Sequence, residues 1–325
     1  MAMQDNHSDC GLERTQWQNP PVLKPNLSSK LLASLRRNRL RDGYPISSKP
    51  ITLGRVGSLE IRLAQTEREI RKAQRLRYKV FYKEMAAKPD SQTKFTRRDA
   101  DAYDAICDHL LVLDHDSPKK KFRRLEPRIV GTYRLLRQEM ANLYGGFYTA
   151  SEFNINSILE AHPERRFLEL GRSCVLKEYR TKRTIELLWQ GIWAYVQIHK
   201  IDVMIGCASI MGTDPQVLAE PLTFLSKLGK APEEWSVDAL PHISLPLEQM
   251  DPSAINDKAA LRSLPPLLKA YMRLGCYFSN NAMVDHQFGT TDVLIILPLE
   301  NIDPKYIEHY STTNVKDAVA MHQYQ

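Results

Sequence analysis

The sequence of 325 residues lacks a hydrophobic run long enough to cross a membrane. Its best apolar stretch, Val293–Leu299, falls well short of the roughly 18 residues that a spanning helix needs. The N-terminus is polar and lacks the apolar centre of a secretory signal peptide. These absences predict a cytoplasmic protein, whose only membrane contact would be peripheral, on the inner surface.

Cysteine is scarce, and no two cysteines form a C-x-x-C pair. The five positions are Cys10, Cys107, Cys174, Cys207 and Cys276. An odd, scattered set predicts reduced thiols rather than a disulfide framework. Cys174 and Cys207 lie in apolar, strand-like runs, where cysteine more often packs as a small hydrophobe than acts as a nucleophile. The histidines also lack metal-ligand spacing, so no metal site is predicted.

Basic residues exceed acidic ones, 45 against 38, and the formal net charge is +7. They cluster at residues 35–43, 119–124 and 178–183. Such clusters suit an acidic protein or an anionic bilayer surface, although a solvated basic loop explains 119–124 equally well. No zinc finger or other nucleic-acid motif accompanies the clusters, which makes nucleic acid the least favoured partner.

Composition divides the chain into three parts. Residues 1–50 are rich in Pro, Ser, Asn and basic side chains and predict a disordered basic arm. Within the arm, residues 28–40 have the leucines and arginines of an amphipathic helix, which would lie at a membrane interface or pack on its own domain. Residues 51–300 form one domain, and 301–325 are a polar C-terminal tail.

Helical and strand-like patterns are mixed along residues 51–300. Thr66 and Glu69 have capping-box spacing at the start of a helix, and residues 185–196 carry a strong helical apolar stripe. Further helices are predicted from Asp214 onward and over 264–274. The predicted strands cover residues 109–114, 128–136, 166–176, 203–212 and 292–299. This mixture predicts an α/β (α+β) fold.

Charged residues recur within the apolar strands, where they cost free energy unless they pair or face a cleft. Glu169 stands between two leucines and must point to one face of its strand, where an exposed glutamate is the ordinary case. The following Gly171 favours another interpretation. A bulge there would re-aim Arg172, and bulges are frequent beside active sites.

Four segments then carry a resemblance: LRYKVF (76–81), DADAYD (99–104), GTYRLL (131–136) and FLELGR (167–172). In this order and spacing they resemble the acyl-homoserine-lactone synthases and, more closely, the bacterial L-ornithine N-acyltransferases. Residues 263–275 are also typical of the second group. The resemblance covers roughly residues 55–300 and implies a GNAT-type fold, a mixed, mostly antiparallel central sheet flanked by helices. It further implies transfer of a 3-hydroxyacyl chain from acyl carrier protein to the α-amine of L-ornithine, giving lyso-ornithine lipid.

The resemblance also assigns roles to residues. Glu169 matches the favoured general base, and Arg172 completes its catalytic motif. The positions matching the substrate-binding residues are Arg77, Phe81, Asp101, Asp104 and Arg134. Of these, Arg77 and Phe81 would shape the substrate pocket, and the two aspartates suit the side-chain ammonium of ornithine. Arg134, together with Arg172, would orient the acceptor or support the glutamate. A lone acidic segment such as 99–104 would otherwise indicate an exposed turn.

The donor end departs from the usual GNAT pattern, in which two glycines let a helix start approach the pyrophosphate of coenzyme A. Here Arg183 and Ile185 replace both glycines, and their side chains hinder that approach. We therefore expect no permanently bound cofactor, and the phosphopantetheine of acyl carrier protein as donor. Arg180, Lys182 and Arg183 would attract the acidic carrier, unless they are simply solvated.

Other functions fit parts of the sequence. An acyl-homoserine-lactone synthase would use S-adenosylmethionine as acceptor, but residues 263–275 favour the ornithine group. A non-catalytic, membrane-active protein is disfavoured because no spanning or pore-forming segment is present. His109 and Asp114 have the spacing of glycerolipid acyltransferases. In a strand they would face opposite sides, so we interpret this match as coincidental.

Overall fold

The computed structural model describes residues 52–116, 126–228 and 231–310. The predicted basic arm, the cluster at 119–124 and residues 311–325 lie outside the described residues. Among those described, no helix has the length and apolar character needed to cross a membrane.

Ten strands form one sheet in the order β1-β2-β3-β4-β5-β6-β10-β9-β7, with β8 paired to β10. The strands are β1 (Thr52–Val56), β2 (Leu59–Leu63), β3 (Asp108–Asp114), β4 (Arg128–Arg137), β5 (Phe167–Val175), β6 (Val203–Met211), β7 (Ser244–Pro246), β8 (Tyr277–Phe278), β9 (Asn281–Asp285) and β10 (Thr290–Pro298). All neighbours pair antiparallel except β5 and β6, which are parallel. The predicted mixed, mostly antiparallel sheet is confirmed.

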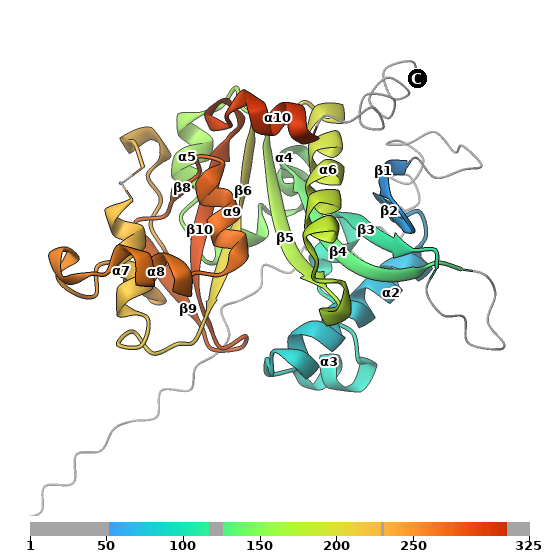
Figure 1. The fold of residues 1–325 in the computed structure, drawn as a ribbon, viewed down its shortest axis with the longest axis horizontal. Helices are drawn as coiled ribbons and strands as arrows, with labels where there is room; N and C mark the ends of the chain where they lie inside the picture. The colour runs from blue at the N-terminus through green and yellow to red at the C-terminus, as the bar shows by residue number, and fades with distance from the viewer. Residues whose placement is uncertain (1–51, 117–125, 229–230, 311–325) are drawn as a thin grey trace, which may run out of the picture.

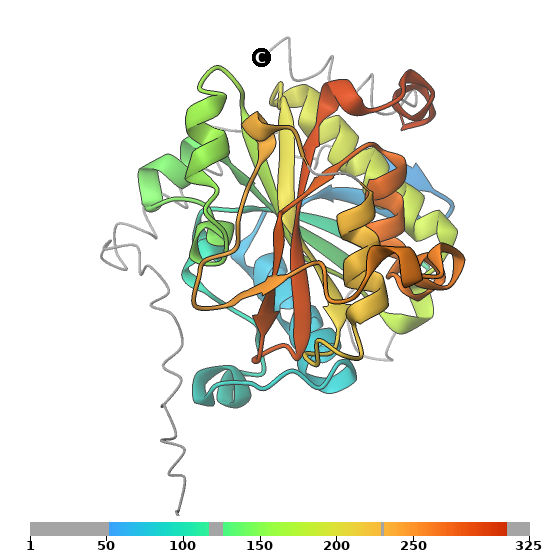
Figure 2. The ribbon, with the colours of Figure 1, turned by 90° about the vertical axis from the view of Figure 1, so that its left-hand side faces the viewer.

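Helices cover both faces of the sheet (Figure 2). They are α2 (Glu67–Tyr78), α3 (Ser91–Thr96), α4 (Gln138–Tyr144), α5 (Asn156–Ala161), α6 (Lys182–Ile198), α7 (Ala219–Lys227), α8 (Asp257–Ser263), α9 (Pro266–Arg273) and α10 (Pro304–Tyr310). The long helix α6 packs with α7–α10 on one face, while α2, α4 and α5 lie on the other. Thr66 caps α2 by accepting a hydrogen bond from the Glu69 N–H at 3.2 Å, as its spacing predicts.

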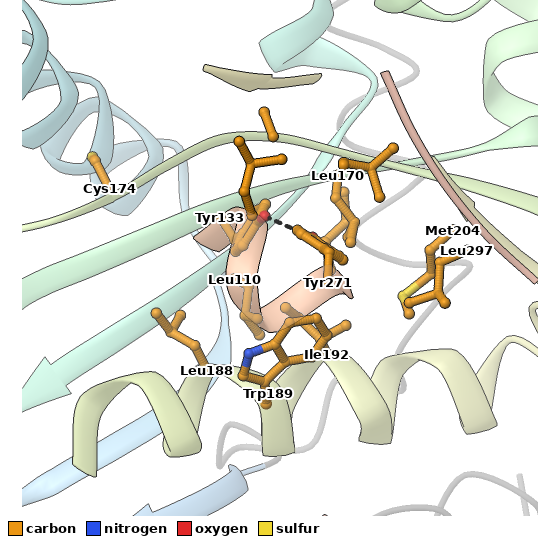
Figure 3. Packing of buried hydrophobic residues seen from close by; sticks show 14 of the residues in the cluster. Leu110, Tyr133, Leu170, Cys174, Leu188, Trp189, Ile192, Met204, Tyr271 and Leu297 are labelled. Carbon is orange, nitrogen blue, oxygen red and sulfur yellow. Dashed lines mark hydrogen bonds between the residues drawn. The ribbon is translucent and has the colours of Figure 1, made fainter. Parts of the chain in front are cut away.

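The core beneath α6 shows why apolar and charged side chains alternate along the strands of the sheet (Figure 3). Trp189 and Ile192 of α6 pack toward Tyr133 and other inward residues of the strands. The hydroxyl oxygens of Tyr133 and Tyr271 lie 3.2 Å apart, so even the polar ends of these buried rings are paired. Residues next to these in sequence must point to the opposite face, where the charged side chains gather.

Two local predictions are wrong. The helix expected from Asp214 begins only at Ala219, because the Asp214 carboxylate accepts from the Gln216 N–H at 2.9 Å and stabilises a turn instead. The expected C-terminal tail includes helix α10 in its described part. Its Tyr310 ring stacks on Trp189 with centroids 6.1 Å apart, so this stretch belongs to the folded domain.

Strands β5 and β6 separate partway along their length. They pair only at Phe167↔Val203, Leu168↔Met204 and Glu169↔Ile205. Both then continue, to Val175 and Met211, and over these fully described ranges they make no further pairs with each other. Figure 1 shows β5 turning toward β4 while β6 follows β10. The sheet therefore opens between two parallel strands, immediately after Glu169.

Candidate active site

Glu169 lies at the last pair before the opening. Its neighbours Leu168 and Leu170 belong to the core under α6, so the glutamate points to the other face of the sheet. Its carboxylate accepts from the backbone N–H groups of Tyr148 and Thr149, each at 2.8 Å, and from the Thr149 hydroxyl. These two residues begin the 3-10 turn η3 (Tyr148–Ser151), whose first N–H groups have no partner inside the turn. The glutamate is thus buried and held in place.

The surroundings of Glu169 change its acidity. Burial raises the pKa of its carboxyl and outweighs the lowering by the Thr149 and Tyr148 hydrogen bonds and by Arg134. Only 5% of the residue is exposed to solvent. A carboxylate with a raised pKa is a better proton acceptor than an exposed glutamate, which suits acid–base chemistry.

A bulge in β5 turns Arg172 toward Tyr148, the residue that also binds Glu169: Nη2 of Arg172 donates to the Tyr148 hydroxyl at 3.3 Å. Arg134 pairs with Gly171 and Thr132 with Cys174, so two residues of β5 lie opposite one of β4. The expectation of a bulge at Gly171 is confirmed in position. The residue of the bulge that adopts the left-handed conformation, however, is Arg172, with φ of 52°. A non-glycine residue in this region costs about 1–2 kcal/mol, which the surroundings must offset.

The Arg172 guanidinium lies between two aromatic rings. Its centre is 5.1 Å from the centroid of Tyr148 and 5.0 Å from that of Phe288. Phe288 belongs to the β9–β10 turn and meets Phe81 edge-on at 5.7 Å. This turn also accepts a backbone hydrogen bond, from Lys88 to Gln287 at 2.8 Å. Beyond the opening, Arg172 of β5 therefore contacts the turn that leads into β10, the strand that pairs with β6.

Arg77 of α2 is fully buried among aspartates. Its guanidinium contacts Asp99 at 2.8 Å and Asp104 at 2.7 Å, and Gln74 donates to Asp104 at 2.9 Å. Burial alone would raise the pKa of Asp104, but Arg77 and Arg134 outweigh it and hold that pKa well below the usual range. Asp104 is therefore ionised, and its carboxylate is occupied by protein groups.

Arg134 and Asp101 complete this network. Nη1 of Arg134 lies 2.7 Å from both Asp101 carboxylate oxygens and 3.5 Å from Asp104. Asp101 and Asp104 also exchange hydrogen bonds in a capping box around the 3-10 turn η2 (Ala102–Ala105). Burial would raise the pKa of Asp101, but the charges of Arg134 and Arg172 together with the Arg134 hydrogen bond outweigh it, so that the pKa is lowered. The acidic segment is thus turned inward toward arginines and is no exposed turn.

The three arginines of this network differ in access to solvent. The side chains of Arg77 and Arg134 are 1% and 4% exposed, whereas that of Arg172 is 18% exposed. Arg172 also lies farther from its aspartates, 3.8 Å from Asp99 and 3.7 Å from Asp101. Arg172 is therefore the arginine best able to reach another molecule.

The predicted donor-binding residues lie at the start of α6, which follows the open end of β5. Arg180 contacts Glu84 at 2.5 Å, and Lys182 lies 3.6 Å from Glu186 with its side chain 91% exposed. Arg183 is exposed as well. Thr181 caps the helix by accepting from the Thr184 N–H at 3.3 Å. This basic group therefore begins beside the end of β5, where Nε of Arg180 donates to the Val175 carbonyl oxygen at 2.9 Å.

Some residues of the site were not predicted. Thr149, Glu152 and Asp292 lie outside the four motifs, and sequence spacing does not connect them. Burial raises the pKa of Glu152 to about 8, with help from the charge of Asp292. The only available signal was a charged residue at the start of the apolar run 292–299.

Two other sequence features have structural roles. Burial raises the pKa of the Cys174 and Cys207 thiols, which stay protonated and favour the packing interpretation over a nucleophile. His109 lies 3.0 Å from the Asp104 carbonyl oxygen, while Asp114 accepts from the Tyr179 hydroxyl at 2.7 Å. The two residues have separate partners, as expected for a coincidental motif.

The chain resembles known proteins at the level of a family model, of full-length relatives and of solved structures. The family model described as an acetyltransferase (GNAT) domain matches residues 76–190. An L-ornithine N(alpha)-acyltransferase of Agrobacterium fabrum is 52% identical over 79% of this chain and 86% of its own length. The L-ornithine N(alpha)-acyltransferase of Brucella abortus is 50% identical over 80% of this chain and 91% of its own length. The solved structure of an N-acyl amino acid synthase from uncultured soil microbes, 10% identical, covers 82% of this chain and 98% of its own, with a TM-score of 0.39.

A sheet that opens between two parallel strands beside a buried carboxylate, together with the GNAT-domain match, defines a GNAT-type acyltransferase. The extent and identity of the full-length relatives go further. The chain belongs to the family of L-ornithine N(alpha)-acyltransferases.

Proposed function

We propose that this enzyme transfers a 3-hydroxyacyl chain from acyl carrier protein to the α-amine of L-ornithine, forming lyso-ornithine lipid. The names of the relatives supply the acceptor. The observation that carries the proposal is the position of Glu169, buried and fixed where β5 and β6 stop pairing. An amine entering the opening there meets a proton acceptor next to the space for an acyl thioester.

Glu169 acts as the general base in this scheme. The α-amine attacks the thioester carbonyl carbon, the nitrogen–carbon bond forms, and Glu169 accepts the proton that the nitrogen loses, directly or through one water. Collapse of the tetrahedral intermediate breaks the carbon–sulfur bond. The carrier thiolate then takes up the proton, so that amide and free thiol leave together and Glu169 is ionised again.

Arg172 orients the acceptor, because it is the most accessible arginine of the network, it shares with Glu169 the contact to Tyr148, and a guanidinium suits a carboxylate. Arg134 and Asp101 hold Arg172 in reach, and Phe81 supports it through Phe288. Arg77 and Asp104 act as positioning residues that fix the arginine–aspartate network. This assignment differs from the expected contact of Asp104 with substrate, since its oxygens are already bound by Arg77 and Gln74.

The donor side rests on charge and on the exposed start of α6. Arg180, Lys182 and Arg183 present positive charge where the pantetheine arm would enter, and acyl carrier protein is acidic. Side chains at Arg183 and Ile185 disfavour close approach of a pyrophosphate. The reaction takes place in the cytoplasm, and the single-chain lipid product suits a peripheral position on an anionic membrane surface, with the basic arm as the contact.

The test is a reconstituted reaction. Purified enzyme is incubated with 3-hydroxyacyl carrier protein and, separately, with ornithine, other amino acids or S-adenosylmethionine, and products are identified by mass. We expect N-acylornithine and one released carrier thiol per amide. A parallel reaction with the coenzyme A thioester should be much slower. A lactone formed from S-adenosylmethionine, or no transfer to any amine, would contradict the proposal.

A further inference from the structure

A second group of acids lies on the same face of the sheet as Glu169. Glu152 follows the turn η3, and its carboxylate accepts a hydrogen bond from the Cys207 thiol of β6 at 3.0 Å. The Thr149 hydroxyl lies 4.0 Å from the Cys207 sulfur and donates to Glu169. One threonine and one cysteine thus connect the two glutamates, which places Glu152 next to the proposed base.

Asp292 of β10 extends this group toward the open end of the sheet. It pairs with Ser209, and the next pair on that face is Leu294 with Cys207. Asp292 is 8% exposed; the Thr290 and Ser209 hydroxyls act on its carboxyl and lower its pKa, yet its Oδ1 accepts no hydrogen bond from any described residue. A buried carboxylate oxygen without a donor costs free energy, so this atom is suited to a donor from another molecule.

The electrostatics of the pair point to a cation. Burial and the charge of Asp292 raise the pKa of Glu152 to about 8, and burial raises that of Asp292 to about 6. Within the described residues neither carboxylate forms an ion pair, and the positive charge that lowers the pKa of both is that of Arg172. That guanidinium is already held by Asp99 and Asp101. Two buried acids without a counter-charge are stabilised when an ammonium group enters between them.

We propose that Glu152 and Asp292 form the subsite that binds the side-chain ammonium of a diamino acid acceptor. The inference rests on the proposed function and deepens it by assigning acceptor selectivity. With the side-chain ammonium at Glu152 and Asp292, the α-amine lies toward Glu169 and the α-carboxylate toward Arg172. Asp101 and Asp104, the residues expected to bind this ammonium, are instead neutralised by Arg134 and Arg77.

Binding of the ammonium at this subsite is coupled to the loss of a proton from Glu152. At neutral pH the free enzyme keeps Glu152 protonated, and the incoming ammonium displaces that proton to solvent. The groups facing Glu152 are Cys207 on β6, Asp292 on β10, Asp285 on β9 and Arg172 on β5. The first three are neutral or acidic, so the cation gains most when Glu152 is ionised.

The test compares ornithine with norvaline, which has the same carbon chain but no side-chain amine. For Glu152→Gln and Asp292→Asn we expect the KM for ornithine to rise about 10- to 100-fold, with little change for norvaline. In the wild type, the KM for ornithine should fall as the pH rises toward 8 and then level off, whereas that for norvaline should lack this step. The exposed Glu164→Gln serves as control.

The outcomes separate the two proposals. If the wild type acylates ornithine but both variants keep its KM and its preference over norvaline, the subsite assignment is overturned. If the wild type acylates no amino acid, the proposed function itself fails. Should a variant not fold, the wild-type pH profiles of the two acceptors still decide the question, because a common profile would contradict the subsite.

Discussion

Arg77 and Asp104 form a buried ion pair, with Nη2 of the arginine 2.7 Å from the aspartate carboxylate. Arg77 belongs to α2 and Asp104 to the turn η2, and neither element is a neighbour of the other in sequence. Because Arg134 of β4 also contacts Asp104, the pair ties a helix and a turn to the strand beside Glu169. The Arg77–Asp104 pair thereby holds Arg134 in place, and Arg134 in turn holds Asp101 close to Arg172.

Replacing Arg77 should therefore destabilise the protein. Arg77→Met leaves Asp99 and Asp104 buried without their main cation, and we expect the free energy of unfolding to fall by about 3–5 kcal/mol. The matched control is Arg71→Met on the same helix, whose exposed pair with Glu67 should contribute less than about 0.5 kcal/mol. Both are measured by urea denaturation.

The loss at Arg77 should depend on pH. In the wild type the pKa of Asp104 is depressed, so its contribution is present above the unfolded value of about 4 and lost as the pH falls below it. The difference between wild type and Arg77→Met should hence shrink at acidic pH. An equal difference at pH 7 and at acidic pH would contradict an ionised Asp104.

Glu169→Gln should lower kcat by about 10²- to 10⁴-fold, because the amide cannot accept the proton. In the wild type, the raised pKa of Glu169 means that the base is lost as the pH falls through a value above the ordinary glutamate pKa. That acidic limb should disappear in the variant. Exposed Glu178→Gln is the control, and a wild-type rate in Glu169→Gln would refute the base assignment.

Gly206 should be intolerant of a side chain. A Cβ at this position would lie 2.3 Å from the Leu170 carbonyl oxygen, a backbone atom at the point where β5 and β6 separate. We expect Gly206→Ala to cost about 1–3 kcal/mol and to reduce activity. Gly171→Ala, where a Cβ meets nothing within 4 Å, should change stability by less than about 1 kcal/mol. Thermal unfolding of both variants provides the comparison.

The left-handed conformation of Arg172 gives a prediction about its backbone. Arg172→Ala and Arg172→Gly should both lose activity, on the order of tenfold or more, since each removes the guanidinium. The glycine variant should be more stable than the alanine variant by about 1 kcal/mol, because glycine has no strain at positive φ. At the neighbouring Ser173 the order should reverse. The same order at both positions would contradict the strained bulge.

Much of the fold could be predicted from periodicity. The helix over 185–196 and the strands over 109–114, 128–136, 166–176, 203–212 and 292–299 correspond to α6, β3, β4, β5, β6 and β10. Each of these elements buries an apolar face, and the regular spacing of its apolar residues along the sequence reveals that face. The strands β1, β2, β7, β8 and β9 are short and were not predicted, because so few residues carry little periodic signal.

The sequence by itself determined the class of the protein and the residue types of its site, because the motifs around Arg77, Asp101, Arg134 and Glu169 are local patterns. Only the tertiary structure decided which aspartate pairs with which arginine, and that Glu152 and Asp292 share a face with Glu169. Partners of that kind come from strands distant in the chain. Their approach is fixed by sheet register and by the separation of β5 from β6, and neither is encoded in any single segment.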